Sequence, residues 1–186
     1  MFIRKMNNQN DVEEQKTTHS LVEQILRSGS EVFSREEIIK FLGCVQCGVC
    51  VGSCPSSMWT AWRARLLIRK MQLKSCENIL SDESLWFCTT CYTCQERCPK
   101  QIPITDIIKV VRNLAVKHGY MKDTHKRICS FFLTYGHAVP PTDEIKKIRK
   151  ALGLAELPPT VCTDLRMLKE VLGIIEKTGF NKIYRE

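Results

Sequence analysis

Two short stretches decide the fold: CVQCGVCVGSCP at residues 44–55 and CTTCYTCQERCP at residues 88–99. Both follow the spacing C-x2-C-x2-C-x3-C-P, and the second begins 44 residues after the first (88 − 44). This spacing is typical of proteins that bind 4Fe–4S clusters through cysteine thiolates. Cysteines at i, i+3 and i+6 can reach three corners of a cubane from one loop. The candidate ligands are the eight motif cysteines: Cys44, Cys47, Cys50, Cys54, Cys88, Cys91, Cys94 and Cys98.

The fourth cysteine of each motif lies beyond a turn that aims it away from the first three. In bacterial two-cluster ferredoxins the corresponding cysteine ligates the other cluster. By that rule two 4Fe–4S clusters are expected, each with three ligands from one motif and one from the other. The predicted ligand sets are Cys44, Cys47, Cys50 and Cys98 for the first cluster, and Cys88, Cys91, Cys94 and Cys54 for the second. Gly48 and Gly52 are expected to let the backbone approach the cluster sulfides.

Zinc is the main rival for these cysteines, since all-cysteine zinc sites also use C-x2-C pairs. Zinc ribbons, however, separate two such pairs by a hairpin and do not place four cysteines within eleven residues. A zinc-dependent basic binding module is kept as an alternative of a different class. The chain has eleven cysteines, an odd number that argues against a disulfide scaffold. Cys76, Cys129 and Cys162 lie outside both motifs and are left unassigned.

Other redox chemistry leaves no recognisable pattern in the sequence. No G-x-G-x-x-G opens a helix, so neither a flavin nor a nicotinamide site is predicted. No C-x4-C-x2-C occurs, so a plant-type 2Fe–2S domain is not expected either. Eight cysteines saturate two cubanes and leave no iron position open for a substrate. The sequence therefore predicts electron transfer without any catalytic residue of its own.

Charge and hydropathy predict a cytoplasmic protein without a membrane helix. The formal net charge is +8, but the Lys and Arg residues are spread over helical stretches. That distribution favours acidic protein partners over nucleic acid. Residues 1–20 contain no apolar core of a secretory signal. The uncharged stretch 41–62 is long enough for a membrane helix, but it holds four cysteines, three glycines and Pro55.

Helical periodicity dominates and alternating strand patterns are nearly absent, which predicts an all-α fold. The sequence Ser34-Arg35-Glu36-Glu37 is a capping box, and Ser81 is a second candidate cap. Trp59, Trp62 and Leu66 are expected on one face of a helix, with the tryptophans packing around the clusters. The expected helices begin at Ser20 and after Ser34 and Ser81, and span about 58–73, 104–118, 125–135, 143–152 and 164–178. Three segments follow: an N-terminal arm and short helix (1–32), a two-cluster domain (33–118) and a C-terminal helical extension for subunit contacts (119–186).

From about Phe33 to Val116 the chain resembles the helical ferredoxins, whose clusters lie between helices. The 33 residues between Cys54 and Cys88 (55–87), read as helix, fit that group better than the compact bacterial ferredoxins. The stretch LWFCTTCYTCQERCP, residues 85–99, closely resembles the C subunit of the heterodisulfide reductase of methanogens.

The resemblance implies an electron relay from the flavin-containing A subunit to the B subunit, which reduces the mixed disulfide of coenzymes M and B. It also implies a larger complex with a hydrogenase or another electron donor. The C-C-G repeats typical of the B subunit are missing here. An iron–sulfur subunit of a succinate, fumarate or glycolate oxidoreductase is the remaining redox alternative.

Overall fold

Helices are the only kind of regular element in the part of the chain that the structure describes. The computed structural model describes residues 20–74 and 78–183, and every regular element in those ranges is a helix. The predicted all-α class is therefore confirmed. The chain divides into two units, Met1–Tyr120 and Met121–Glu186. The predicted N-terminal arm up to residue 19 and Cys76 lie outside the described residues, and the three predicted segments stay a prediction.

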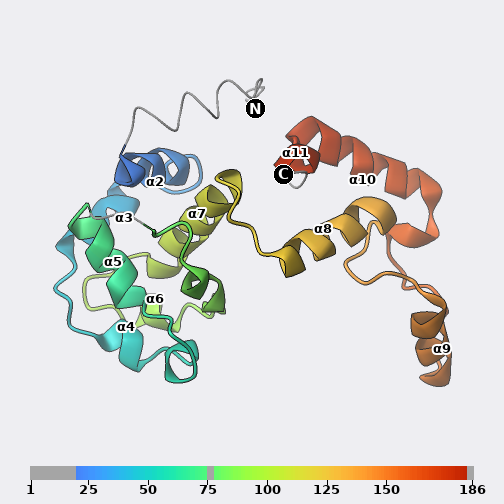
Figure 1. Ribbon diagram of the computed structural model, residues 1–186, viewed down its shortest axis with the longest axis horizontal. Helices are drawn as coiled ribbons and strands as arrows, with labels where there is room; N and C mark the ends of the chain where they lie inside the picture. The colour runs from blue at the N-terminus through green and yellow to red at the C-terminus, as the bar shows by residue number, and fades with distance from the viewer. Residues whose placement is uncertain (1–19, 75–77, 184–186) are drawn as a thin grey trace. The chain divides into compact units, whose positions relative to one another are not determined.

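Unit 1 contains both cysteine motifs and the helices that flank them (Figure 1). Its α-helices are α2 (Leu21–Gly29), α3 (Arg35–Ile39), α4 (Val49–Gly52), α5 (Ala64–Gln72), α6 (Thr93–Glu96) and α7 (Ile104–Lys117). Its 3-10 helices are η1 (Lys40–Gly43), η2 (Ser56–Met58) and η3 (Glu83–Phe87). Each motif thus follows a 3-10 helix, contains one short α-helix and leads to a longer one.

The core of unit 1 lies between α2, α3, α5 and α7, and α2 packs directly against α7 (Figure 1). Gly29 ends α2 at a close approach, because a Cβ there would overlap the side chain of Ile38. The largest fully buried side chains are almost all apolar: Ile25, Ile38, Phe41, Ile68, Met71, Ile79, Leu85, Ile102, Ile107, Ile108 and Val111. Burying them removes the apolar faces predicted from helical spacing from water.

Local side-chain caps explain where the first two helices begin. The Ser34 side chain accepts from the Glu37 backbone, and the Glu37 carboxylate accepts from the Ser34 backbone. The same reciprocal pair joins Ser20 and Glu23 at α2. Each box satisfies two amide groups that a helix start otherwise leaves unpaired. The capping box predicted at Ser34 is confirmed.

Two expectations about the segment between the motifs are wrong. The predicted helix at 58–73 begins only at Ala64, so Trp59 precedes it and is 85% exposed. Trp62 is buried, but Leu66 is 52% exposed, so the three residues share no buried face. The cap of the following element is Asp82, whose carboxylate accepts from the Ser84 amide, and not Ser81. The η2 turn (Ser56–Met58) and the coil after it occupy the first part of the predicted helix 58–73, so helical spacing does not apply to Trp59 and Trp62.

Unit 2 consists of helices with a small core. They are α8 (Asp123–Tyr135), α9 (Asp143–Ala151), η4 (Val161–Thr163), α10 (Leu165–Thr178) and α11 (Phe180–Ile183). These bounds confirm the three helices predicted after residue 120. Among the described residues of this unit, Ile175 is the one large apolar side chain that is buried. Gly136 caps α8 in the left-handed conformation, at φ 64°, which glycine adopts at little cost.

Candidate metal centre

The two cysteine motifs repeat in conformation as well as in sequence. The second and fourth residues after the first cysteine have positive φ in both motifs: 59° at Gln46 and 86° at Gly48, 53° at Thr90 and 64° at Tyr92. Positive φ is costly for any residue except glycine. A four-residue helix then follows, α4 in the first motif and α6 in the second. The same loop conformation therefore occurs twice. Three of the four positive-φ residues, Gln46, Thr90 and Tyr92, are not glycine, so the conformation is costly at these positions.

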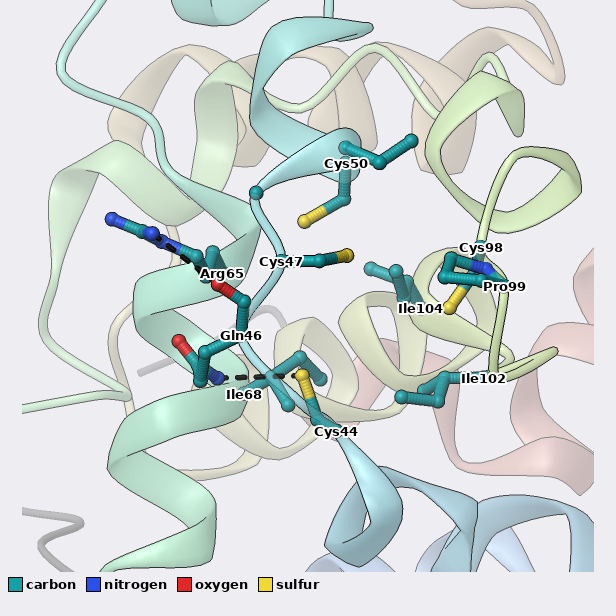
Figure 2. Close-up of a pocket in the computed structure, with 12 residues that line it drawn as sticks. Cys44, Gln46, Cys47, Cys50, Arg65, Ile68, Cys98, Pro99, Ile102 and Ile104 are labelled. Atoms are coloured by element: carbon teal, nitrogen blue, oxygen red, sulfur yellow. Dashed lines mark hydrogen bonds between the residues drawn. The ribbon is translucent and has the colours of Figure 1, made fainter.

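Four cysteines from both motifs line one cavity of unit 1. They are Cys44, Cys47, Cys50 and Cys98. Figure 2 shows their side chains around one shared space, with three coming from the first motif and Cys98 from the far end of the second. Apolar side chains from α5 and from the segment after the second motif, including Ile68 and Ile102, complete the wall. The structure thus brings the fourth cysteine of the second motif to the first three of the first motif.

The remaining four cysteines form a second group. Burial raises the pKa of Cys94, and the neighbouring thiols of Cys88, Cys54 and Cys91 raise it further. Cys54 likewise adds to the raised pKa of Cys88, in which burial is again the largest cause. Cys54 therefore lies within electrostatic reach of the second motif, although its sequence neighbours belong to the first. The fourth cysteine of each motif therefore lies near cysteines of the other motif.

The two groups lie next to each other. Burial raises the pKa of Cys50 to about 11, and the thiol of Cys94 contributes more to that shift than Cys44 or Cys47. The short helices that carry these two cysteines, α4 and α6, pack together. Cys47 and Cys91, which occupy corresponding positions in the two motifs, are both exposed. Each group thus has one edge towards solvent and another towards its neighbour.

Hydrogen bonds to sulfur occur in both groups. The side-chain amide of Gln46 donates to Sγ of Cys44 at 3.3 Å. In the second motif, Sγ of Cys91 and the Thr93 hydroxyl are 3.4 Å apart, and this contact is the largest cause of a lowered pKa at Cys91. Because thiolates are the form that binds metal, the Gln46 donor at Cys44 and the lowered pKa of Cys91 both favour the ligating state.

A polar network anchors the second loop to α7. Tyr92, at the second positive-φ position of that loop, donates its hydroxyl to Oδ1 of Asp106 at 2.9 Å. The side-chain amide of Gln95 donates to Oδ2 of the same carboxylate at 3.0 Å. Lys109 pairs with Asp106 at 3.6 Å and also bonds the Tyr92 hydroxyl. Sequence reasoning missed this network, since the bonds that join Tyr92 and Gln95 to α7 span 11 to 17 residues of sequence.

The donor chemistry of both groups fits a 4Fe–4S cluster. Each group offers four thiols, and a cubane binds one cysteine at each of its four irons. Within the described residues, no three His, Cys, Asp or Glu side chains are close enough to hold a single metal ion. Ligands of a cubane stand further apart than those of one ion. Cys129 and Cys162 lie in unit 2, on segments separate from both motifs.

Comparison with known proteins identifies the domain and the family. A family model described as a 4Fe–4S dicluster domain matches residues 43–103. The iron–sulfur C subunit of the CoB–CoM heterodisulfide reductase of Methanopyrus kandleri is 41% identical over 172 residues, which cover 92% of this chain and 90% of that protein. This chain belongs to the C-subunit family of the heterodisulfide reductases.

Two further relatives agree with that assignment. The C subunit of the H(2):CoB–CoM heterodisulfide, ferredoxin reductase of Methanothermobacter thermautotrophicus is 46% identical over 87% of this chain and 90% of its own length. The C subunit of the ferredoxin:CoB–CoM heterodisulfide reductase of Methanosarcina mazei is 45% identical over 78% and 89%. As a heterodisulfide reductase C subunit, the chain is an iron–sulfur electron-transfer subunit of an oxidoreductase.

The family assignment confirms the resemblance noted in the second motif. It favours a heterodisulfide reductase over a succinate-type iron–sulfur subunit and over a zinc module. In the ranges 20–74 and 78–183, no helix of this heterodisulfide reductase subunit combines the length and apolar character that crossing a bilayer requires.

Proposed function

We propose that this chain holds two 4Fe–4S clusters and relays electrons from the A subunit to the B subunit of a heterodisulfide reductase. One cluster would be bound by Cys44, Cys47, Cys50 and Cys98, and the other by Cys54, Cys88, Cys91 and Cys94. The cavity that Cys98 shares with the first motif supports the first set. The electrostatic coupling of Cys54 to Cys88 and Cys94 supports the second.

The observation that carries the proposal is that Cys98 lines the cavity of the first motif, while Cys54 lies near Cys88 and Cys94 of the second. Two clusters supply a pair of one-electron carriers, each saturated by four protein thiolates. Saturated ligation leaves this chain no position at which to bind a disulfide. Because Cys50 and Cys94 lie within electrostatic reach of each other, the two sites are close enough to act as one short conductor. A conductor requires a donor and an acceptor on other subunits.

Features of unit 2 and the names of the relatives support partners for this chain. Three relatives are named as the C subunits of heterodisulfide reductases, which implies other subunits in their complexes. In unit 2, α10 exposes Leu165, Met167 and Ile174 at 75%, 54% and 61%. We propose that these exposed apolar side chains help to dock the A and B subunits. The complex would also contain a hydrogenase or another electron donor. A cytoplasmic location stays a prediction.

Iron content and single cysteine substitutions test the ligand sets. Anaerobically purified protein is expected to hold about eight irons per chain. Cys98→Ala should remove the cluster of Cys44, Cys47 and Cys50, and Cys54→Ala the other cluster. Cys162→Ala, outside both motifs, is the control and should leave both clusters intact. If each substitution damaged the cluster of its own motif, the proposed ligand sets would be wrong.

The relay itself is tested in the reconstituted complex. Loss of either cluster should abolish flavin-driven reduction of the coenzyme M–coenzyme B heterodisulfide, because neither site alone connects donor to acceptor. Reduction of the flavin by its own donor should largely survive. A complex that assembles with a one-cluster variant and still reduces the heterodisulfide at the normal rate would refute the relay.

A further inference from the structure

In each motif one side chain donates hydrogen bonds to two backbone carbonyl oxygens, and the two pairs of carbonyls correspond in position. We call each such set of bonds a clamp. In the first motif, the amide of Gln72 on α5 donates to the carbonyl oxygens of Phe41 and Cys44, at 3.3 and 2.9 Å. In the second, the guanidinium of Arg112 on α7 donates to the corresponding carbonyl oxygens. Those carbonyls belong to Leu85 and Cys88, with Nη2 distances of 2.8 and 2.6 Å.

The correspondence follows the internal repeat. Leu85 stands 44 residues after Phe41 (85 − 41), and Cys88 stands 44 residues after Cys44 (88 − 44). In both cases the donor comes from the helix that follows its motif. Each clamp therefore fixes the approach to the first cysteine of a motif, and the two differ in chemistry but not in position.

The two clamps differ by one charge. A glutamine amide is neutral, whereas a guanidinium stays protonated at any physiological pH. Arg112 is half-buried, and its guanidinium lies 5.6 Å from the ring centre of Trp86. The ion pairs between described residues do not include Arg112. Its charge is therefore uncompensated by a carboxylate in that part of the chain and is only partly screened by water.

Other charged and polar side chains near the motifs do not give the two sites a comparable difference in charge. Arg65 lines the first cavity, but its side chain is exposed, and solvent weakens the field of an exposed charge. Asp106 and Lys109 beside the second motif pair with each other, so their charges largely cancel. Hydrogen bonds to sulfur occur on both sides. Gln46 donates to Cys44, Cys91 donates to the Thr93 hydroxyl, and the Thr105 hydroxyl lies 3.6 Å from Sγ of Cys94. These hydrogen-bond partners of sulfur are neutral, so the half-buried charge of Arg112 is the difference in charge on which the inference rests.

Reduction adds one negative charge to a 4Fe–4S site, so a nearby buried cation favours the reduced state and raises the reduction potential. We infer that Arg112 makes the site of Cys54, Cys88, Cys91 and Cys94 the higher-potential one of the two. An electron that enters the pair would then come to rest beside Arg112. This inference rests on the ligand sets proposed above.

The test is an anaerobic EPR-monitored redox titration of the two-cluster protein. Cys47→Ser and Cys91→Ser, a matched pair of exposed ligands, assign each potential to its site. In Arg112→Gln, which copies the neutral clamp of the first motif, the ratio of reduced to oxidised second site at a fixed potential should fall about tenfold. For a one-electron couple that is a lowering of about 59 mV. The first site should keep its potential.

Two further variants separate charge from geometry. Arg112→Lys retains the charge but not the planar fork, and it should keep most of the second-site potential. Arg65→Gln removes an exposed charge and should shift the first site much less than Arg112→Gln shifts the second. Equal shifts in Arg112→Gln and Arg112→Lys would overturn the inference, because the effect would then come from positioning.

The two reduction potentials of the wild-type protein also test the inference. Two clusters of equal potential, or a higher potential at the first site, would overturn the role of Arg112 and leave the proposed relay standing. This holds even if Arg112→Gln fails to retain its second cluster. A chain that never binds two clusters would instead defeat the proposed function together with this inference.

Discussion

Replacing Gln72 with glutamate reverses the chemistry of the first clamp without changing its shape. Nε2 of Gln72 donates to the carbonyl oxygens of Phe41, Leu42 and Cys44, at 3.3, 3.1 and 2.9 Å. An ionised carboxylate only accepts hydrogen bonds, so Gln72→Glu would set a negative charge against three carbonyl oxygens.

The expected cost follows from these contacts. One amide group has two hydrogens, so about two bonds of about 1 kcal/mol net are lost. Because Gln72 is partly exposed, water takes over some of them, and Gln72→Ala should cost about 1–2 kcal/mol. The repulsion in Gln72→Glu should raise the cost to about 2–3 kcal/mol. With an m-value of about 2 kcal/mol/M, the urea midpoint of Gln72→Glu falls by about 1 M or slightly more.

The assay is anaerobic urea unfolding of the cluster-loaded protein, followed by helical circular dichroism and by visible absorbance. Gln101→Glu is the matched control, since it introduces the same charge at an exposed turn just after the second motif. Its midpoint should stay close to that of the wild type. A stabilising role of the Gln72 clamp would be contradicted if Gln72→Glu kept the wild-type urea midpoint, or if Gln101→Glu lowered the midpoint by the same amount.

Three further substitutions test the loops and unit 2. Gly48→Ala places a side chain at φ 86° and should lower the free energy of unfolding in urea by about 1 kcal/mol. Gly43→Ala, with open space around its Cβ, should be nearly neutral. Equal costs for the two variants would contradict a penalty from positive φ. Asp106→Ala removes the acceptor shared by two side chains of the second loop and should lower stability by about 2 kcal/mol, with faster bleaching of the clusters under chelator; an unchanged bleaching rate would speak against an anchoring role. Gly136→Ala and Gly153→Ala both place a side chain at positive φ, but only the first overlaps neighbouring side chains. Hydrogen exchange in residues 121–183 should therefore speed up more for Gly136→Ala, and the reverse order would show that overlap is not the dominant cost.

The local features of this protein could be predicted from its sequence. The cysteine spacing depends on a loop of a few residues, and the capping box at Ser34 joins groups three residues apart. Helices such as α7 and α10 follow from apolar residues at helical spacing, which any neighbouring surface can bury. Such features depend on short-range geometry, so the prediction of an all-α protein with two four-cysteine motifs was correct. The exchange of fourth cysteines was predicted by analogy, and as a statement about iron ligands it stays a prediction.

Long-range packing decided what the sequence pattern could not express. Trp59 lies at helical spacing from Trp62, yet it is 85% exposed because the helix begins only at Ala64. Arg112 bonds the carbonyl oxygen of Cys88 across 24 residues of sequence, and Gln72 bonds that of Cys44 across 28. Neither residue type indicates such a role, because any exposed helix face carries Gln and Arg. Only the packing of α5 and α7 against the two motifs turns one of them into a neutral clamp and the other into a charged one.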